Sequence, residues 1–175
     1  MSYITTRNNV RLYYKDWGTG RPVIMLHGWP LSSDTFDELA MTVANAGYRA
    51  IAYDRRGFGR SDQPWHGYDY DTLADDLADV IEQTGANDAT LVGFSMGGGE
   101  VVRYIARHAG RGVSQAVLIG SVVPYLPKDA GNPQGVDLAI FAEMAKGIER
   151  DRAGFWGTFF KSFYGVGMLS SPVTD

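Results

Sequence analysis

The sequence predicts an α/β domain built on a mostly parallel sheet with helices on both faces. Three short apolar runs, residues 23–26, 50–53 and 89–94, have the composition of strands that are buried on both sides, and residues 113–119 are one more predicted strand. Segments with apolar residues at helical spacing separate these runs, and this alternation is typical of right-handed βαβ units. The carboxyl ends of such strands meet at one edge of the sheet, where ligands usually bind.

Composition narrows the class of protein. The chain has 175 residues, 45% of them hydrophobic, a net charge of -4 and no cysteine. These values indicate one folded domain and give no electrostatic reason for binding nucleic acid or an anionic membrane. The lack of cysteine excludes a disulfide framework, a thiolate nucleophile and a Cys-ligated metal. The sequence shows neither a signal-peptide pattern nor an apolar run near the ~20 residues of a membrane span. We therefore expect no membrane partner and a cytoplasmic location.

The N-terminal segment predicts antiparallel strands with one buried face. Val10, Leu12 and Tyr14 alternate with polar or charged residues, and the turn residues 18–20 end the pattern.

Three amphipathic helices are expected between the apolar runs. The first carries Phe36, Leu39, Ala40 and Val43 on one side. Asp71 is the expected N-cap of the second, whose apolar residues are Leu73, Leu77, Val80 and Ile81. Its carboxylates are expected to form a solvated face, namely Asp71, Asp75, Asp76 and Asp79. The third helix has the apolar residues Val101, Val102, Tyr104 and Ile105.

A change of pattern places the domain boundary after residue 123. Residues 1–123 form the predicted core, and a Pro- and Gly-rich linker opens residues 124–175. The linker leads to an apolar helix and an aromatic-rich segment, which we interpret as the start of a helical cap. The alternative is that both are further core helices.

Gly93-Phe94-Ser95-Met96-Gly97 fits G-x-S-x-G and follows an apolar strand directly, as a nucleophile turn requires. Glycines are needed there because the strand and the helix approach closely, and the run Gly97–Gly99 predicts tight packing on the sheet. Ser95 is therefore the candidate nucleophile. The alternative is a glycine-rich turn with an incidental serine.

Two further motifs follow strand ends. His27-Gly28-Trp29-Pro30 follows the first apolar run, and we expect His27 to hold this loop rather than to act as a base. Residues 54–62 contain Gly57 and Gly59, for which we expect positive φ, and charges that can lock neighbouring loops. A phosphate-binding role for this loop is the alternative, although it lacks the lysine of a P-loop.

In this order the three motifs resemble the HG-x-P, D-x-R-G-x-G-x-S and G-x-S-x-G motifs of the α/β-hydrolase superfamily, over essentially the whole chain. The run 93–100 and residues 122–125 are most similar to cofactor-free haloperoxidases, also called perhydrolases or aryl esterases. The resemblance implies the α/β-hydrolase fold and hydrolysis of small carboxylic esters through an acyl-serine, with perhydrolase activity in addition and no cofactor or metal. It also implies that Trp29 and Met96 donate backbone N–H groups to an oxyanion hole.

The residues that would activate Ser95 are not found in this chain. In this family the acid and then the histidine follow the serine. His27 and His66 precede Ser95, and His108 lies roughly 20 Å along the predicted helix. The later carboxylates lie in the linker, the cap or at the chain end: Asp129, Asp137, Glu143, Glu149, Asp151 and Asp175.

We therefore expect the last strands of the fold, with the acid and histidine, beyond Asp175, and an inactive isolated chain. The chain is expected to be part of a split polypeptide or a truncated form of a longer protein; a natural pseudoenzyme is the alternative. An open parallel sheet edge promotes aggregation. We accordingly expect a complementary C-terminal fragment, or a homo-oligomer partner, to cover it.

The sequence also allows a second function, the binding of a small apolar ligand, because aromatic residues can form either an acyl pocket or a ligand-binding pocket. Phe155, Trp156 and Phe159 are the expected substrate-binding residues, within an aromatic stretch that ends at Tyr164. A non-catalytic protein that binds a small apolar ligand would use the same stretch. Serine at position 95 argues against haloalkane dehalogenases and epoxide hydrolases, which use aspartate there. Lactonase and C–C hydrolase activities stay open.

Overall fold

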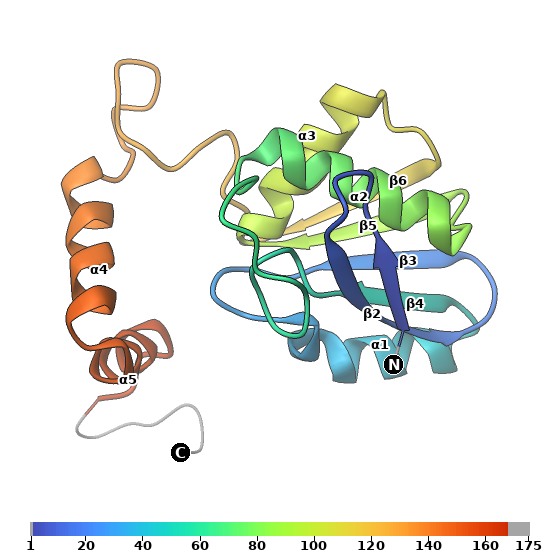
Figure 1. Cartoon of the computed structure of the whole chain (residues 1–175), viewed down its shortest axis with the longest axis horizontal. Helices are drawn as coiled ribbons and strands as arrows, with labels where there is room; N and C mark the ends of the chain where they lie inside the picture. The colour runs from blue at the N-terminus through green and yellow to red at the C-terminus, as the bar shows by residue number, and fades with distance from the viewer. Residues whose placement is uncertain (1, 168–175) are drawn as a thin grey trace. The chain divides into compact units, whose positions relative to one another are not determined.

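The structure, a computed structural model, describes residues 2–167 and divides into two units, Met1–Pro124 and Tyr125–Asp175 (Figure 1). Residues 168–175, which include Asp175 and the end of the predicted cap, lie outside the described residues.

The first unit contains a six-stranded sheet in the order β1-β2-β4-β3-β5-β6. The first two strands are antiparallel, and β4, β3, β5 and β6 run parallel to one another. This arrangement confirms the predicted mostly parallel sheet. The bounds are β1 Ser2–Thr5, β2 Arg11–Gly18, β3 Pro22–Leu26, β4 Arg49–Tyr53, β5 Ala89–Phe94 and β6 Val113–Ile119.

Helices cover both faces of this sheet, as predicted (Figure 1). The 3₁₀ helix η1 (Ser33–Phe36) and α1 (Asp37–Asn45) pack on one face, where Phe36 and Ala40 meet Met25, Ala52 and Val92. On the other face lie α2 (Tyr70–Thr84) and α3 (Met96–His108). Their core combines apolar residues of both helices with those of the strands: Leu12, Ile24, Leu26, Ile51, Leu77, Val80, Leu91, Val101 and Tyr104.

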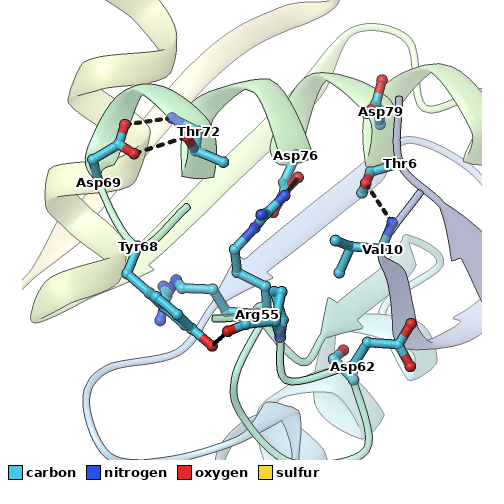
Figure 2. Close-up of polar contacts among 12 residues, drawn as sticks. Thr6, Val10, Arg55, Asp62, Tyr68, Asp69, Thr72, Asp76 and Asp79 are labelled. Carbon is cyan, nitrogen blue, oxygen red and sulfur yellow. Dashed lines mark hydrogen bonds and ion pairs between the residues drawn. The ribbon is translucent and has the colours of Figure 1, made fainter. Parts of the chain in front are cut away.

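The predicted N-cap of α2 is wrong by two residues. Asp69, not Asp71, has extended backbone angles and accepts a hydrogen bond from the Thr72 N–H at 2.9 Å (Figure 2). Asp71 instead lies in the first turn, where its carboxylate pairs with Arg103 of α3. Aspartate is favourable at both positions, so sequence alone did not separate them.

The predicted solvated acidic face of α2 is also partly wrong. Asp76 and Asp79 are buried, and their carboxylates form ion pairs with Arg56 and Arg7 at 2.6 and 2.7 Å. Figure 2 shows both carboxylates on the same helix. A buried carboxylate is tolerated when a hydrogen-bonded cation neutralises it, and both arginines come from distant loops.

Strand β6 is present as predicted, and most of its residues are exposed. Val117, Leu118 and Ile119 keep 45%, 42% and 42% of their surface accessible. Val102 and Ile105, two of the apolar residues of α3, are also exposed. Within residues 2–167, β6 pairs only with β5, so one side of this apolar strand has no neighbour in the sheet.

The second unit contains two helices, α4 (Leu138–Arg150) and α5 (Arg152–Phe163). The side chains of Asp137 and Asp151 cap them by accepting N–H hydrogen bonds of the first turn. None of the described residues of either helix is buried. Across residues 2–167, every helix is too short or too polar to cross a membrane.

Candidate active site

Ser95 lies at the sharp turn between β5 and α3, with φ 53° and ψ -115°. Positive φ is strained for a residue with a side chain, so surrounding contacts must hold it. The Ser95 N–H donates to the Ile119 carbonyl at 2.9 Å, and the Ser95 carbonyl accepts from Gly98 and Val122 at 3.0 and 3.3 Å. The strand–turn–helix context required for a nucleophile serine is therefore present.

Two glycines bring other segments against this turn. A Cβ on Gly97 would lie 2.2 Å from the Leu26 carbonyl oxygen, so only glycine lets α3 approach β3 this closely. A Cβ on Gly28 would lie 3.1 Å from Ser95 Cβ. The loop after β3 therefore packs directly beside the candidate nucleophile.

The two predicted oxyanion donors belong to the segments that meet here. Trp29 follows Gly28, and Met96 is the first residue of α3. Backbone N–H groups in the first turn of a helix have no intrahelical acceptor and favour negative charge. The arrangement brings both peptide segments to Ser95, while their catalytic role stays a prediction.

His27 holds the loop after β3, as expected. Its side chain is buried; Nε2 faces the Arg55 N–H at 3.1 Å and Nδ1 faces the Gly28 carbonyl at 2.8 Å. Because the Arg55 N–H can only donate, Nε2 must accept and Nδ1 must carry the proton. Burial and then the Arg55 charge lower the pKa of His27 to about 3, so the ring is neutral and suits a tether better than a base.

We expect His27 to make the fold sensitive to acid. Between pH 6.5 and about 3 the unfolded chain binds a proton at His27 that the folded chain does not bind. Acid therefore favours unfolding, and the free energy of unfolding should fall by roughly 2 kcal/mol between pH 7 and pH 5. Urea denaturation of the wild type and His27→Gln at both pH values checks this. The variant should lose most of the difference, whereas His66→Gln, at an exposed loop position, should keep it. An unchanged pH difference in His27→Gln would contradict this expectation.

The loop 54–62 locks neighbouring segments, as its charges predicted. The buried Asp54 carboxylate accepts from the N–H groups of Ser33 and Arg60, both at 2.7 Å. Gly57 and Gly59 have φ of 81° and 51°, which confirms the expected positive angles. The loop thus joins β4 to the start of η1.

The α/β-hydrolase fold model matches residues 21–169, which is most of the chain. The chain belongs to the α/β-hydrolase family. It is 43% identical over its whole length to the non-heme chloroperoxidase CPO-A1 of Kitasatospora aureofaciens and 44% identical to the bifunctional esterase/perhydrolase DCH of Acinetobacter calcoaceticus. It covers 64% of the length of each, as their N-terminal part. A bromoperoxidase structure from Bacillus anthracis superimposes with a TM-score of 0.90 and 42% identity, over 99% of this chain and 64% of that one.

The two remaining histidines of this α/β hydrolase lie at the end of a helix and in a loop. His108 lies at the far end of α3 from Ser95, where Nε2 is 2.8 Å from an Asp75 oxygen and the ring stacks on Tyr104. His66 is exposed in the loop before α2. Among the later acidic residues, Asp137 and Asp151 cap helices, and Asp175 lies outside the described residues. In residues 2–167 no group of three or more acidic or histidine side chains could hold a metal ion.

A buried polar cluster beside the site was missed by the sequence analysis. Tyr53, Arg55 and Glu100 are buried, and the Tyr53 hydroxyl and the Arg55 guanidinium, which lies next to Met96, both donate to the Glu100 carboxylate. The available signal was a charged residue directly after three glycines, on the face of α3 that also carries Val101 and Tyr104. The three predicted substrate-binding residues belong to α5 of the second unit, where Phe155, Trp156 and Phe159 contact one another, and their role stays a prediction.

Proposed function

We propose that this α/β hydrolase is a serine hydrolase that acts on small carboxylic esters through an acyl-serine, and that it also accepts hydrogen peroxide. The observation that carries the proposal is the strained position of Ser95 directly against the Gly28 loop. The similarity to an esterase/perhydrolase and to non-heme chloroperoxidases supports this substrate class.

In the proposed reaction, Ser95 Oγ attacks the ester carbonyl while a histidine takes its proton. Negative charge develops on the carbonyl oxygen, and the N–H groups of Trp29 and Met96 stabilise it. Collapse expels the alcohol, which takes the proton from the histidine, and leaves the acyl group on Ser95. Water then releases the acid, or hydrogen peroxide releases a peracid.

The base and its orienting acid are proposed to come from a complementary C-terminal segment whose strands extend the sheet at β6. The exposed apolar row Val117–Ile119 supports this, and so does the 64% coverage of the relatives. A homo-oligomer that covers the same edge is the alternative. Intact-mass measurement of the purified native protein decides between them: a longer polypeptide or a companion peptide supports the segment, and a single species of this chain's mass that forms a dimer supports the oligomer.

A fluorophosphonate probe tests the proposed nucleophile, because it labels only serines that a base activates. In the native protein we expect labelling at Ser95, mapped by peptide mass spectrometry. The Ser95→Ala variant should not be labelled, and Ser121→Ala, a nearby serine whose buried hydroxyl has no hydrogen-bond partner in the structure, should be labelled normally. Absence of labelling in the folded wild type would contradict the proposal.

A non-catalytic role in binding a small apolar ligand is the second candidate. It is favoured by an open apolar hollow of about 430 Å³ in the second unit, lined by Ala139, Ile140, Glu143, Met144 and Phe155. In both candidate functions Phe155, Trp156 and Phe159 would contact the apolar part of the small molecule. Failure of the probe to label Ser95, together with saturable binding of a fluorescent fatty ester, would favour this candidate.

A further inference from the structure

The Arg55 side chain contacts three separate segments around Ser95. It is 1% exposed. Its Nη2 donates to the His27 carbonyl at 2.9 Å, and its Nε donates to Glu100 Oε2 at 2.7 Å. Its Nη1 lies 3.9 Å from the Met96 sulfur. One rigid, planar group therefore touches the loop after β3, the residue after the nucleophile, and the helix that the nucleophile opens.

The main chain of Arg55 reaches the same loop by a second route. Its N–H donates to His27 Nε2, and the His27 ring in turn donates from Nδ1 to the Gly28 carbonyl. The Arg55 side chain donates to the His27 carbonyl, which belongs to the peptide between His27 and Gly28. The two peptides that lead to Trp29 are thus anchored to the same arginine, one directly and one through an imidazole.

Glu100 fixes the guanidinium from the other side. Its carboxylate is fully buried, and it accepts from Arg55 and from the Tyr53 hydroxyl. Burial raises the pKa of Glu100, and the Arg55 charge opposes this. A buried ion pair adds little net stability compared with apolar residues of similar size, so stability alone does not account for this cluster.

We propose that Arg55, held by Glu100, is a positioning residue that sets the Trp29 and Met96 amides at the correct separation for a developing oxyanion. This inference rests on the proposed function of Ser95. Oxyanion donors act only when they are placed close to where the charge forms, so misplacement of either peptide by about 1 Å should cost about 10²-fold in rate. Neither Arg55 nor Glu100 needs to touch the substrate for this role.

The test compares two buried ion pairs of the same loop in the native polypeptide. The double variant Arg55→Met/Glu100→Gln removes the proposed device without leaving an unpaired charge. The matched control is Arg56→Met/Asp76→Asn, because Arg56 is equally buried and donates to Asp76 at 2.6 Å but ties the loop to α2 instead. The readouts are kcat and KM for a small aryl ester, the rate constant of fluorophosphonate labelling at Ser95, and the melting temperature.

We expect kcat and the labelling rate of Arg55→Met/Glu100→Gln to fall about 10²-fold, with KM changed less than about threefold. The control should lower the melting temperature to a similar degree while kcat stays within about threefold of wild type. Equal losses of kcat in both double variants would overturn the inference, because they would show a general loss of structure. A wild-type labelling rate in Arg55→Met/Glu100→Gln would overturn it as well.

The experiment also distinguishes failure of the proposed function and failure of the double variant to fold from failure of the inference about Arg55. If the wild type itself is not labelled, the proposed function fails before Arg55 is examined. If the double variant does not fold, Arg55→Lys replaces it, since lysine keeps the charge beside Glu100 but lacks the fork that reaches His27 and Met96 together. We then expect a kcat about tenfold below wild type at a near-normal melting temperature, and an unchanged kcat would contradict the inference.

Discussion

Replacing Ser95 with alanine in the native polypeptide is expected to lower kcat/KM for a small aryl ester by at least about 10⁴-fold. If Ser95 is the nucleophile as proposed, its loss removes the covalent route and leaves only binding and oxyanion stabilisation. Ester hydrolysis followed by absorbance, with the active-site concentration set by probe titration of the wild type, measures this. Retention of more than about one tenth of the activity would exclude Ser95 as the nucleophile.

The same position should show that the fold is strained at the proposed catalytic residue. At φ 53° and ψ -115°, a Cβ is unfavourable and glycine is not. We therefore expect Ser95→Gly to have a free energy of unfolding about 1 kcal/mol higher than Ser95→Ala, which retains the Cβ. Denaturant unfolding of the two variants makes the comparison, and equal stabilities would argue against the strained turn.

Replacing Gly97 with alanine is expected to destabilise the first unit by about 3 kcal/mol or more. The new Cβ would meet the Leu26 carbonyl oxygen at 2.2 Å. Leu26 cannot yield, because β3 is hydrogen-bonded between β4 and β5. Helix α3 must therefore move, and Ser95 moves with it. Both the midpoint of urea unfolding and probe labelling should fall.

Gly157→Ala is the control for the Gly97 variant. Gly157 also lies inside a helix, α5, but a Cβ there has no heavy atom within 4 Å. Alanine should therefore leave stability unchanged or raise it slightly, because it favours the helical backbone. A Gly97→Ala protein as stable as the wild type would show that α3 and β3 are not packed as closely as described.

The succession of strands and helices along the chain was predictable, because burial of a strand or helix produces a local pattern of apolar residues. Apolar runs predicted β3, β4 and β5, and the glycine pattern at 93–99 predicted the close approach of α3 to the sheet. The turn at Ser95 was also predictable, since strand, turn and helix are adjacent in sequence. The His27 loop could be placed at a strand end for the same reason. Its position beside Ser95 was expected because the carboxyl ends of parallel strands meet at one edge of the sheet.

Pairings between distant residues could not be predicted in the same way. Asp76 and Asp79 read as surface residues because their arginine partners lie 20 and 72 positions away. The Arg55–Glu100 pair spans 45 positions, so the sequence does not show that these two residues pair, although the three glycines before Glu100 are a local sign of its burial. The strand at 113–119 was predictable, but its exposure was not, because a local pattern does not show which neighbours cover a strand; within residues 2–167 only β5 pairs with β6.

The free side of β6 has a consequence for handling the protein. Within residues 2–167 the outer edge of β6 pairs with no strand, and an open edge beside the exposed Val117–Ile119 can template a strand from a nearby polypeptide. Light scattering should therefore increase steeply with protein concentration while this side is bare. A further strand paired with this edge would remove it from solvent, and light scattering would then report whether the edge is covered.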